Sequence, residues 1–297
     1  MSFTAEVKNE VSKLELNKTD SLSELSGIMH EFKDLKVTTE NASVARRIFK
    51  IVKDIYKVNA VITVRKGYNY HKNYIYILEI KQKKDIIIND LSLNNPILDN
   101  YLVDDEYLLR AYLRGLFLIC GSINDPKKSR YHLEFVVNDL DYANFISDKL
   151  NYFNLNSKVI KRDLKYMVYI KEAEKIGDFL RIINATSAVL YYEDIRIYRD
   201  HKNMTNRLNN CEQANVDKII QTAFNQVKDI NKIKNEFGSL DILDDKTRII
   251  AEYRLKYPEA SLQELSEIIG VETESKLSKS GVYHRMKKIT EIAERIK

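Results

Sequence analysis

The chain has 297 residues, of which 44 % are hydrophobic, a length that favours about two domains over one small core. Its net charge of +5 suggests an anionic partner without requiring one. With only two cysteines, a disulfide framework and a four-thiolate metal site are excluded. The charged start does not resemble a signal peptide, and no run of about 18 apolar residues would span a membrane. We therefore expect a cytoplasmic protein without a cofactor or a metal.

Two helices, predicted over residues 22–32 and 106–120, begin two segments of similar organisation. The first helix has apolar residues at helical spacing, and the second is apolar on nearly all sides, so we expect it to be buried. Each carries glycine in the pattern L-x-G, at Gly27 and Gly115. Because glycine lets two helix backbones approach closely, the matched pair favours a seam between the helices. The alternative is an ordinary helix glycine at each position.

The elements that follow these two helices also repeat. The first copy, residues 1–100, continues with an extended piece (LKVTT), a helix (SVARRIFKIVKDIY) and two strands (NAVITVRKGYNY, NYIYILEIK). The second, residues 101–197, has a strand (RYHLEFVVN), a helix (YANFISDKLNYF), two strands (SKVIKRDL, KYMVYIK) and a closing helix (KIGDFLRIINA). The strand predictions rest on alternating hydrophobicity. We interpret both copies as αββαββα units, which side by side would form a saddle of antiparallel sheet in an α+β protein.

This organisation resembles the LAGLIDADG homing endonucleases in their two-repeat, single-chain form. Their nine-residue motif is matched in the second copy at Leu113, Gly115, Leu116 and Gly121, and less completely in the first copy at Leu25 and Gly27.

The resemblance also places the acids that hold the catalytic metal ions in that family, one near the end of each motif. Here these positions are Phe32 and Cys120, and neither side chain is a hard oxygen ligand for Mg²⁺. Glu31 and Asp125 lie nearby in the sequence, and we interpret both as solvated surface charges. The resemblance therefore implies a nuclease fold without catalytic residues or a metal site.

Residues 57–84 combine basic and aromatic side chains on the strands predicted for the first copy. Such strands are typical of a surface that contacts a phosphate backbone, and Arg65 and Lys66 are the candidate DNA contacts. The alternative is a solvated sheet edge that lysines protect from aggregation. Besides Arg65 and Lys66, the stretch contains Lys57, Lys72, Lys81, Lys83, Lys84, Tyr68, Tyr70, Tyr74 and Tyr76, against the single acid Glu79.

Residues 198–236 are predicted to be a connector and a linker helix. The polar, Asn-rich residues 198–212 form the connector, and Gly238 marks the end of the helix. Residues 237–297 are predicted to be a helix-turn-helix domain. In SLQELSEIIG, Ser261 and Glu264 form a capping box, and Gly270 is the expected helix end.

The last helix begins after Ser278 and has two distinct sides. On a helical wheel, Val282, Met286, Ile289 and Ala293 lie within about 60° of one another as an apolar seam. Residues 276–288 include five Lys or Arg and no acid. This pattern is typical of the second helix of a helix-turn-helix, which spans Ser261 to Glu294 here and enters a DNA major groove. The candidate DNA contacts are Ser278, Lys279, Ser280, Tyr283, His284, Arg285, Lys287 and Lys288.

Two features bear on this interpretation of the last helix. A basic surface helix of a small three-helix bundle would show the same charges. The turn, VETESKL, is also longer than the usual three or four residues.

The whole chain resembles the WhiA family of bacterial regulators of sporulation and cell division. The matching stretches are SFTAEVKNE, LRGLFLICGSINDPKKSRYHLE, NRLNNCEQAN and PEASLQELSEIIG…LSKSGVYHRMKKI. The resemblance implies a degenerate homing-endonuclease domain joined to a helix-turn-helix in a transcription regulator. Where the family usually has a small polar residue, often Asn, this chain has Tyr283, so the recognised base sequence is expected to differ if that position touches a base.

Double-stranded DNA is the partner that this resemblance implies, in a nucleoid-associated protein of cell division, chromosome segregation or sporulation. Other transcription or division proteins are further candidate partners, and no membrane is. A division scaffold with secondary DNA binding and a metal-dependent nuclease are the alternative functions.

Overall fold

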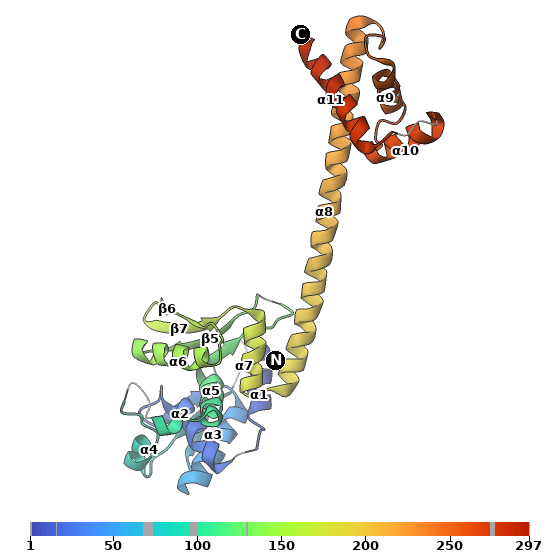
Figure 1. Cartoon of the computed structure of the whole chain (residues 1–297). Coiled ribbons are helices and arrows are strands. Elements are labelled where there is room, and N and C mark those ends of the chain that lie inside the picture. Colours follow the sequence, from blue (N-terminus) through green and yellow to red (C-terminus); the bar gives the residue numbers. More distant parts are fainter. Residues whose placement is uncertain are drawn as a thin grey trace. The chain divides into compact units, whose positions relative to one another are not determined.

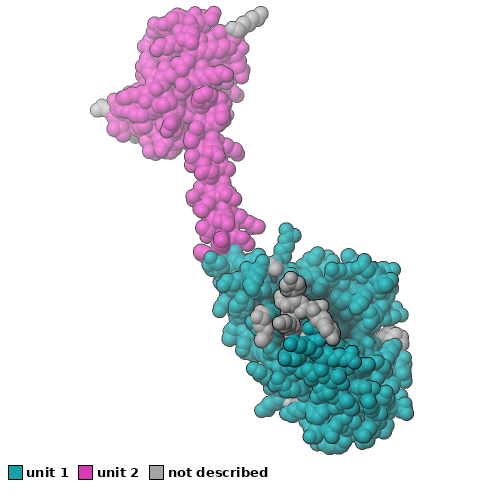
Figure 2. All heavy atoms as spheres, turned by 180° about the vertical axis from the view of Figure 1, so that it is seen from behind, with its two compact units in different colours: residues 1–199 teal, residues 200–297 magenta. Residues whose placement is uncertain are grey.

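The computed structural model describes residues 2–15, 17–67, 74–95, 100–128, 130–273 and 277–296. The protein is of the α+β class and forms two compact units, residues 1–199 and 200–297 (Figure 2). Both predicted repeats lie in the first unit, and the predicted helix-turn-helix segment lies in the second. Within the part of the chain that is described, no helix is long and apolar enough to cross a membrane.

In the part of the first repeat that the structure describes, there is one strand fewer than predicted. Its three strands form an antiparallel sheet in the order β1-β3-β2. Only residues 30–41 separate the glycine helix from the next helix, and they hold a turn and one short strand. The elements are α1 (Phe3–Val11), α2 (Lys18–Met29), β1 (Lys36–Thr39), α3 (Ala42–Tyr56), β2 (Val61–Lys66), β3 (Tyr74–Glu79) and α4 (Lys84–Asp90).

The second repeat has the predicted αββαββα order. Its four strands form an antiparallel sheet in the order β4-β5-β7-β6, and α6 packs against one face of it (Figure 1). After the short helix η1 (Asn100–Leu102), the elements are α5 (Glu106–Cys120), β4 (Gly121–Ile123), β5 (Leu133–Val137), α6 (Leu140–Tyr152), β6 (Lys158–Arg162), β7 (Lys165–Ile170) and α7 (Ala173–Ile182).

Helices α2 and α5 meet at the two matched glycines. A Cβ atom added to Gly27 would lie 2.3 Å from the carbonyl oxygen of Tyr112, and one added to Gly115 would lie 2.0 Å from the carbonyl oxygen of Glu24. Both neighbours are backbone atoms, which cannot turn aside as a flexible side chain can. The two backbones therefore approach to a distance that only glycine permits at these positions.

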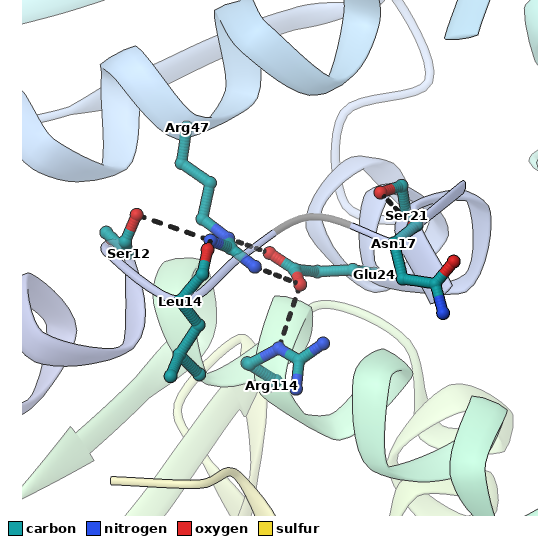
Figure 3. Close-up of polar contacts among 7 residues, drawn as sticks. All are labelled: Ser12, Leu14, Asn17, Ser21, Glu24, Arg47 and Arg114. Carbon is teal, nitrogen blue, oxygen red and sulfur yellow. Dashed lines mark hydrogen bonds and ion pairs between the residues drawn. The ribbon is translucent and has the colours of Figure 1, made fainter. Parts of the chain in front are cut away.

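Three charged side chains are buried beside this seam (Figure 3). Glu24 of α2 accepts hydrogen bonds from Arg47 of α3 and from Nε of Arg114 of α5, the latter at 2.8 Å. Nη1 of Arg47 also donates to the carbonyl oxygens of Leu14, at 2.7 Å, and Ser12, at 3.3 Å. The Glu24 cluster, defined as Glu24, Arg47 and Arg114, thus joins α5 of the second repeat to α2, α3 and the α1–α2 segment.

Helix α8 (Thr186–Phe237) is continuous through the predicted connector. The prediction of a non-helical segment at residues 198–212 is therefore wrong. The sequence has many asparagines there, but no proline or glycine between residues 186 and 237 that would end a helix. Gly238 follows the last helical residue with φ of +72°, the backbone conformation expected of a helix end.

The second unit packs α9 (Asp245–Lys256), α10 (Leu262–Thr273) and α11 (Lys279–Arg295) around the C-terminal end of α8 (Figure 1). Ile230 and Ile233 of α8 belong to this core. The other buried apolar residues are Leu240, Leu243, Ile250, Ala251, Leu265, Ile269, Val282, Met286, Ile289 and Ala293.

The two ends of α10 differ in how well they were predicted. The capping box is confirmed, because Ser261 N donates to Glu264 Oε2 at 2.7 Å and Glu264 N donates to Ser261 Oγ at 3.1 Å. The predicted end at Gly270 is wrong, because α10 continues to Thr273. Glu272 in this added turn accepts hydrogen bonds from the hydroxyl of Tyr253 and the ammonium of Lys256 on α9, which hold the turn in place.

Candidate nucleic-acid interface

Helix α11 buries one side against the unit and exposes the other. The apolar seam of Val282, Met286, Ile289 and Ala293 is at most 2 % exposed. At the start of the helix, the Ser278 hydroxyl accepts a hydrogen bond from Gly281 N at 3.2 Å, which caps the first turn. The seam therefore determines which side chains of α11 reach solvent.

The exposed arc of α11 consists of Lys279, Ser280, Tyr283, His284 and Lys287, all exposed. The rings of Tyr283 and His284 meet edge to face at 5.6 Å, so they present one aromatic surface. Lys287 Nζ lies 4.0 Å from a carboxylate oxygen of Glu291, one turn further along the helix. Most of the arc lies in the N-terminal half of α11, where the helix dipole adds partial positive charge. The lysines of the arc suit the negative charges of an anionic partner, and the hydroxyl and imidazole groups between them suit polar groups of the same partner.

Three predicted contacts lie outside this arc, and one of them is Ser278, the N-cap of the helix. Arg285 is half-buried, and its Nη1 donates to the carbonyl oxygen of Gly281 at 3.4 Å. Lys288 Nζ lies 2.7 Å from Oδ2 of Asp244, the residue that caps α9. Hydrogen bonds from Lys288 and then from Thr247 lower the pKa of Asp244 to about 2. Lys288 therefore links α11 to α9. Its ammonium group is already paired with Asp244, so it is a weaker candidate for a DNA contact than the lysines of the arc.

Lys276 and the turn residues 274–276 lie outside the described residues. The first three residues of the predicted turn VETESKL, residues 271–273, belong to α10. The part of the helix-turn-helix that is described is α10 and α11.

The candidate residues of the first sheet, Arg65 and Lys66, lie on opposite faces of β2. Arg65 pairs with Ile75, and Lys66 pairs with Tyr74. Paired residues share a face, and neighbours along a strand alternate. Tyr74 and Lys66 lie on the same face of the sheet as Leu78, which is buried in the core, but both are themselves exposed to solvent. Only Arg65 lies on its outer face.

Other members of the basic stretch have partners within the fold. Lys57 Nζ and Lys83 Nζ each donate to a backbone carbonyl oxygen at 2.9 Å, and Lys81 Nζ lies 3.7 Å from Glu79. Tyr68, Tyr70 and Lys72 lie outside the described residues. The stretch is thus a less uniform basic surface than its composition suggests.

The outer face of the second sheet carries basic residues that the sequence reasoning missed. Val168 is buried, so its neighbours along β7 alternate to the outer face, which includes Lys165. Strand register then places Arg162 opposite Lys165, and Lys158 opposite Tyr169 on the same face. We call Lys158, Arg162 and Lys165 the outer basic group. The signal that could have revealed it is the alternation of charged and apolar residues in KVIKR.

The two positions at which the resemblance predicts acids, Phe32 and Cys120, offer poor metal ligands. Burial, and then the nearby Glu31 carboxylate, raises the pKa of the Cys120 thiol to about 12, so this group stays protonated at neutral pH. Phe32 packs against the core. Glu31 is half-buried and accepts a hydrogen bond from the side-chain amide of Asn138, and burial raises its pKa. The interpretation of Glu31 as a solvated charge is therefore wrong.

Asp125 is also not a solvated charge. Its side chain is only 22 % exposed. The carboxylate accepts hydrogen bonds from Lys127 N at 2.9 Å and from the Tyr191 hydroxyl at 3.3 Å. It shapes the turn after β4. Among the residues that the structure describes, no group of three His, Cys, Asp or Glu side chains could hold a metal ion.

We expect the purified protein to leave supercoiled plasmid intact in Mg²⁺ or Mn²⁺, because in-line cleavage needs carboxylates that hold the metals. Gel electrophoresis over a long incubation measures this. Glu31→Gln removes the carboxylate that acts on the Cys120 thiol and is the matched control for trace activity. Metal-dependent nicking by the parent protein that disappears in this variant would contradict the expectation.

A two-repeat α+β unit with a glycine helix seam, followed by a helix-turn-helix, defines a LAGLIDADG-like protein with a helix-turn-helix domain at its C-terminal end. Three sequence models match: the WhiA N-terminal LAGLIDADG-like domain at residues 23–94, the WhiA LAGLIDADG-like domain at 109–202 and the WhiA C-terminal helix-turn-helix domain at 205–293. The chain belongs to the WhiA family.

Relatives in other bacteria match over the whole length. A probable cell division protein WhiA of Enterococcus faecalis is 40 % identical over 311 residues, with 100 % of this chain and 99 % of the relative covered. A protein of the same name in Clostridium botulinum is 41 % identical over 319 residues, with the same coverage. The crystal structure of full-length WhiA from Thermatoga maritima is similar with a TM-score of 0.57 and 27 % identity, covering 100 % of this chain and 99 % of that one.

Proposed function

We propose that this protein is a DNA-binding transcription regulator of cell division, chromosome segregation or sporulation. In this proposal its homing-endonuclease-like unit does not cut DNA. The observation that carries the proposal is the exposed arc of α11, which combines lysines, hydroxyls and a histidine without an acid. The relatives' name, probable cell division protein, supports the proposed process.

The proposal gives the members of the arc different roles. Phosphate contacts position a protein on DNA, whereas base-edge contacts specify the sequence. Ser280, Tyr283 and His284 carry hydrogen-bonding groups that suit base edges in a major groove. Lys279 and Lys287 suit phosphates. Tyr283 is 53 % exposed and is larger than the residue usual in the family, so it is the position at which we expect sequence preference to differ.

The outer faces of the two sheets are proposed to add affinity without sequence preference. Replacing Arg65 and Lys158 by alanine should weaken binding to specific and random duplexes alike, because both changes remove positive charge from an outer face. The dependence of binding on salt should flatten by about one unit for each lost phosphate contact. Fluorescence anisotropy across a salt series measures both effects.

Lys66→Ala is the control for this experiment, because Lys66 is a neighbouring strand residue of equal charge on the opposite face. It should change neither the affinity nor the salt slope. If the double variant also keeps the parent slope, the outer faces are ordinary solvated surfaces.

The proposed partner is double-stranded DNA in the nucleoid of the cytoplasm, with transcription or division proteins as further partners. Chromatin immunoprecipitation in the native host tests the proposal. The parent protein should recover a limited set of promoter regions, and a variant with Ser280 and His284 changed to alanine should lose that enrichment. Equal recovery of division proteins before and after nuclease treatment, without promoter enrichment, would instead support a scaffold.

A further inference from the structure

Helix α8 exposes apolar side chains along a stretch that no other part of the described chain covers. Every residue from 200 to 222 is exposed to solvent. Among them, Met204 is 64 % exposed and Leu208 is 55 % exposed, and Ile197 just before the stretch is 63 % exposed. Single exposed apolar residues are ordinary, but a contiguous row of them on one side of a helix marks a candidate interaction surface.

The exposed side chains follow a heptad pattern. Ile197, Met204 and Cys211 are each seven residues apart, which places them at one heptad position, d. Leu208 and Asn215 are likewise seven apart, at position a, and His201 is the a residue one heptad before Leu208. This alternation of three and four residues gives a narrow stripe, which is the seam of a coiled coil and not the wider face that packs on a domain core. Leu190 lies seven residues before Ile197 and would also occupy position d. The a position between them holds the charged residue Asp194, so we begin the seam at Ile197.

The composition of this stretch gives an independent reason to expect a partner helix. Asparagine, a poor helix former, occupies five of its positions: Asn203, Asn206, Asn209, Asn210 and Asn215. No ion pair joins two side chains within residues 200–222 of the described structure. A helix that is rich in asparagine, has no such ion pairs and packs against nothing is marginal in water. Packing along the apolar stripe would stabilise it.

We propose that the partner is a second copy of this chain, and that the two α8 helices form a parallel, in-register coiled coil over residues 197–215. The stripe is complementary to itself. In a parallel pair, position g of one helix faces position e of the next heptad of the other. These positions hold Arg207 and Glu212, which have opposite charges. Asn215 at position a would meet its own copy, an arrangement that specifies register and the dimeric state.

Cys211 makes the register directly testable. In the proposed dimer the two Cys211 thiols face each other at a d position, so diamide should oxidise them to an intermolecular disulfide. Non-reducing gel electrophoresis of the full-length protein should show a covalent dimer, and Cys211→Ser should abolish it. Cys120 does not interfere, because burial raises its thiol pKa to about 12. The matched control is Asn206→Cys in the Cys211→Ser background, an exposed position off the seam that should crosslink much more slowly.

Sedimentation equilibrium of the full-length protein tests the association itself. We expect the parent to be dimeric, and Met204→Glu with Leu208→Glu to raise the dimer dissociation constant by at least about tenfold. Asn206→Glu with Asn210→Glu adds the same charges off the seam and should leave the dissociation constant unchanged. Circular dichroism establishes that both variants keep their helix.

Three results would overturn the proposal. One is a parent protein that stays monomeric at its highest soluble concentration. Another is an equal response of the seam and off-seam charge variants. The third is a dimer in which Cys211 crosslinks no faster than the off-seam cysteine, since that excludes the parallel register. The experiments use no DNA, so their failure is distinct from failure of the proposed DNA binding.

Discussion

Replacing Ser280 and His284 by alanine should reduce the ratio of specific to random DNA binding. Each lost base contact is expected to cost about 1–3 kcal/mol, chiefly on the cognate duplex. Both side chains are exposed in the N-terminal half of α11 and away from its apolar seam, so the fold should persist. Anisotropy titrations with the recovered promoter sequence and with a random duplex measure the ratio, and circular dichroism checks the helices.

Lys287→Ala is the companion change, because a phosphate contact lacks sequence information. It should lower both affinities together and leave their ratio unchanged. Lys288→Ala should behave differently, because Lys288 is paired with Asp244 and its loss acts through the packing of α11 on α9. If a fragment of residues 1–230, which lacks α9 to α11, binds the promoter as selectively as the whole chain, the sheet and not α11 reads the sequence.

Replacing Glu24 by glutamine should lower the free energy of unfolding of the first unit by about 3–5 kcal/mol. Glu24 is 0 % exposed, and the side chains of Arg47 and Arg114 are 2 % and 7 % exposed. Removing the carboxylate would leave two guanidinium groups buried without a compensating charge. Urea denaturation followed by circular dichroism measures the loss in the strand-containing unit.

Glu106→Gln provides the matched control, because Glu106 pairs with Arg110 at 2.7 Å but is 52 % exposed. The same chemical change there should cost about 0.5 kcal/mol or less. The triple change of Glu24 to leucine with Arg47 and Arg114 to methionine should recover much of the lost stability, because no charge is then buried. Equal losses for Glu24→Gln and Glu106→Gln would show that the Glu24 cluster contributes no more than a surface pair.

Local patterns predicted the second unit well. The reciprocal hydrogen bonds of Ser261 and Glu264 involve residues three apart, and the seam of α11 is a periodicity along one helix. Both can be read from neighbouring residues without knowing what they pack against. The end of α10 was mispredicted for the opposite reason. Glu272 is held by Tyr253 and Lys256, which are distant in sequence, and these contacts extend the helix past Gly270.

In the repeats, too, local patterns predicted some elements and missed others. The alternation of the strands and the L-x-G pattern predicted the second repeat, whereas the first lost a strand because residues 30–41 are too few for two. Helix α1 was missed although Phe3, Val7 and Val11 have helical spacing and are buried.

The sequence by itself determined the family and the helix-turn-helix, and it places Phe32 and Cys120 where the resemblance predicts acids. Each of these follows from which residues occur and from how closely they are spaced along the chain. Only the tertiary structure decided that Arg65 and Lys66 lie on opposite faces, that Lys158, Arg162 and Lys165 share one, and that Glu24 lies between two arginines. The reason is physical: strand register and burial bring together residues far apart in the chain, and they determine whether a given charge meets solvent, a counter-charge or the interior.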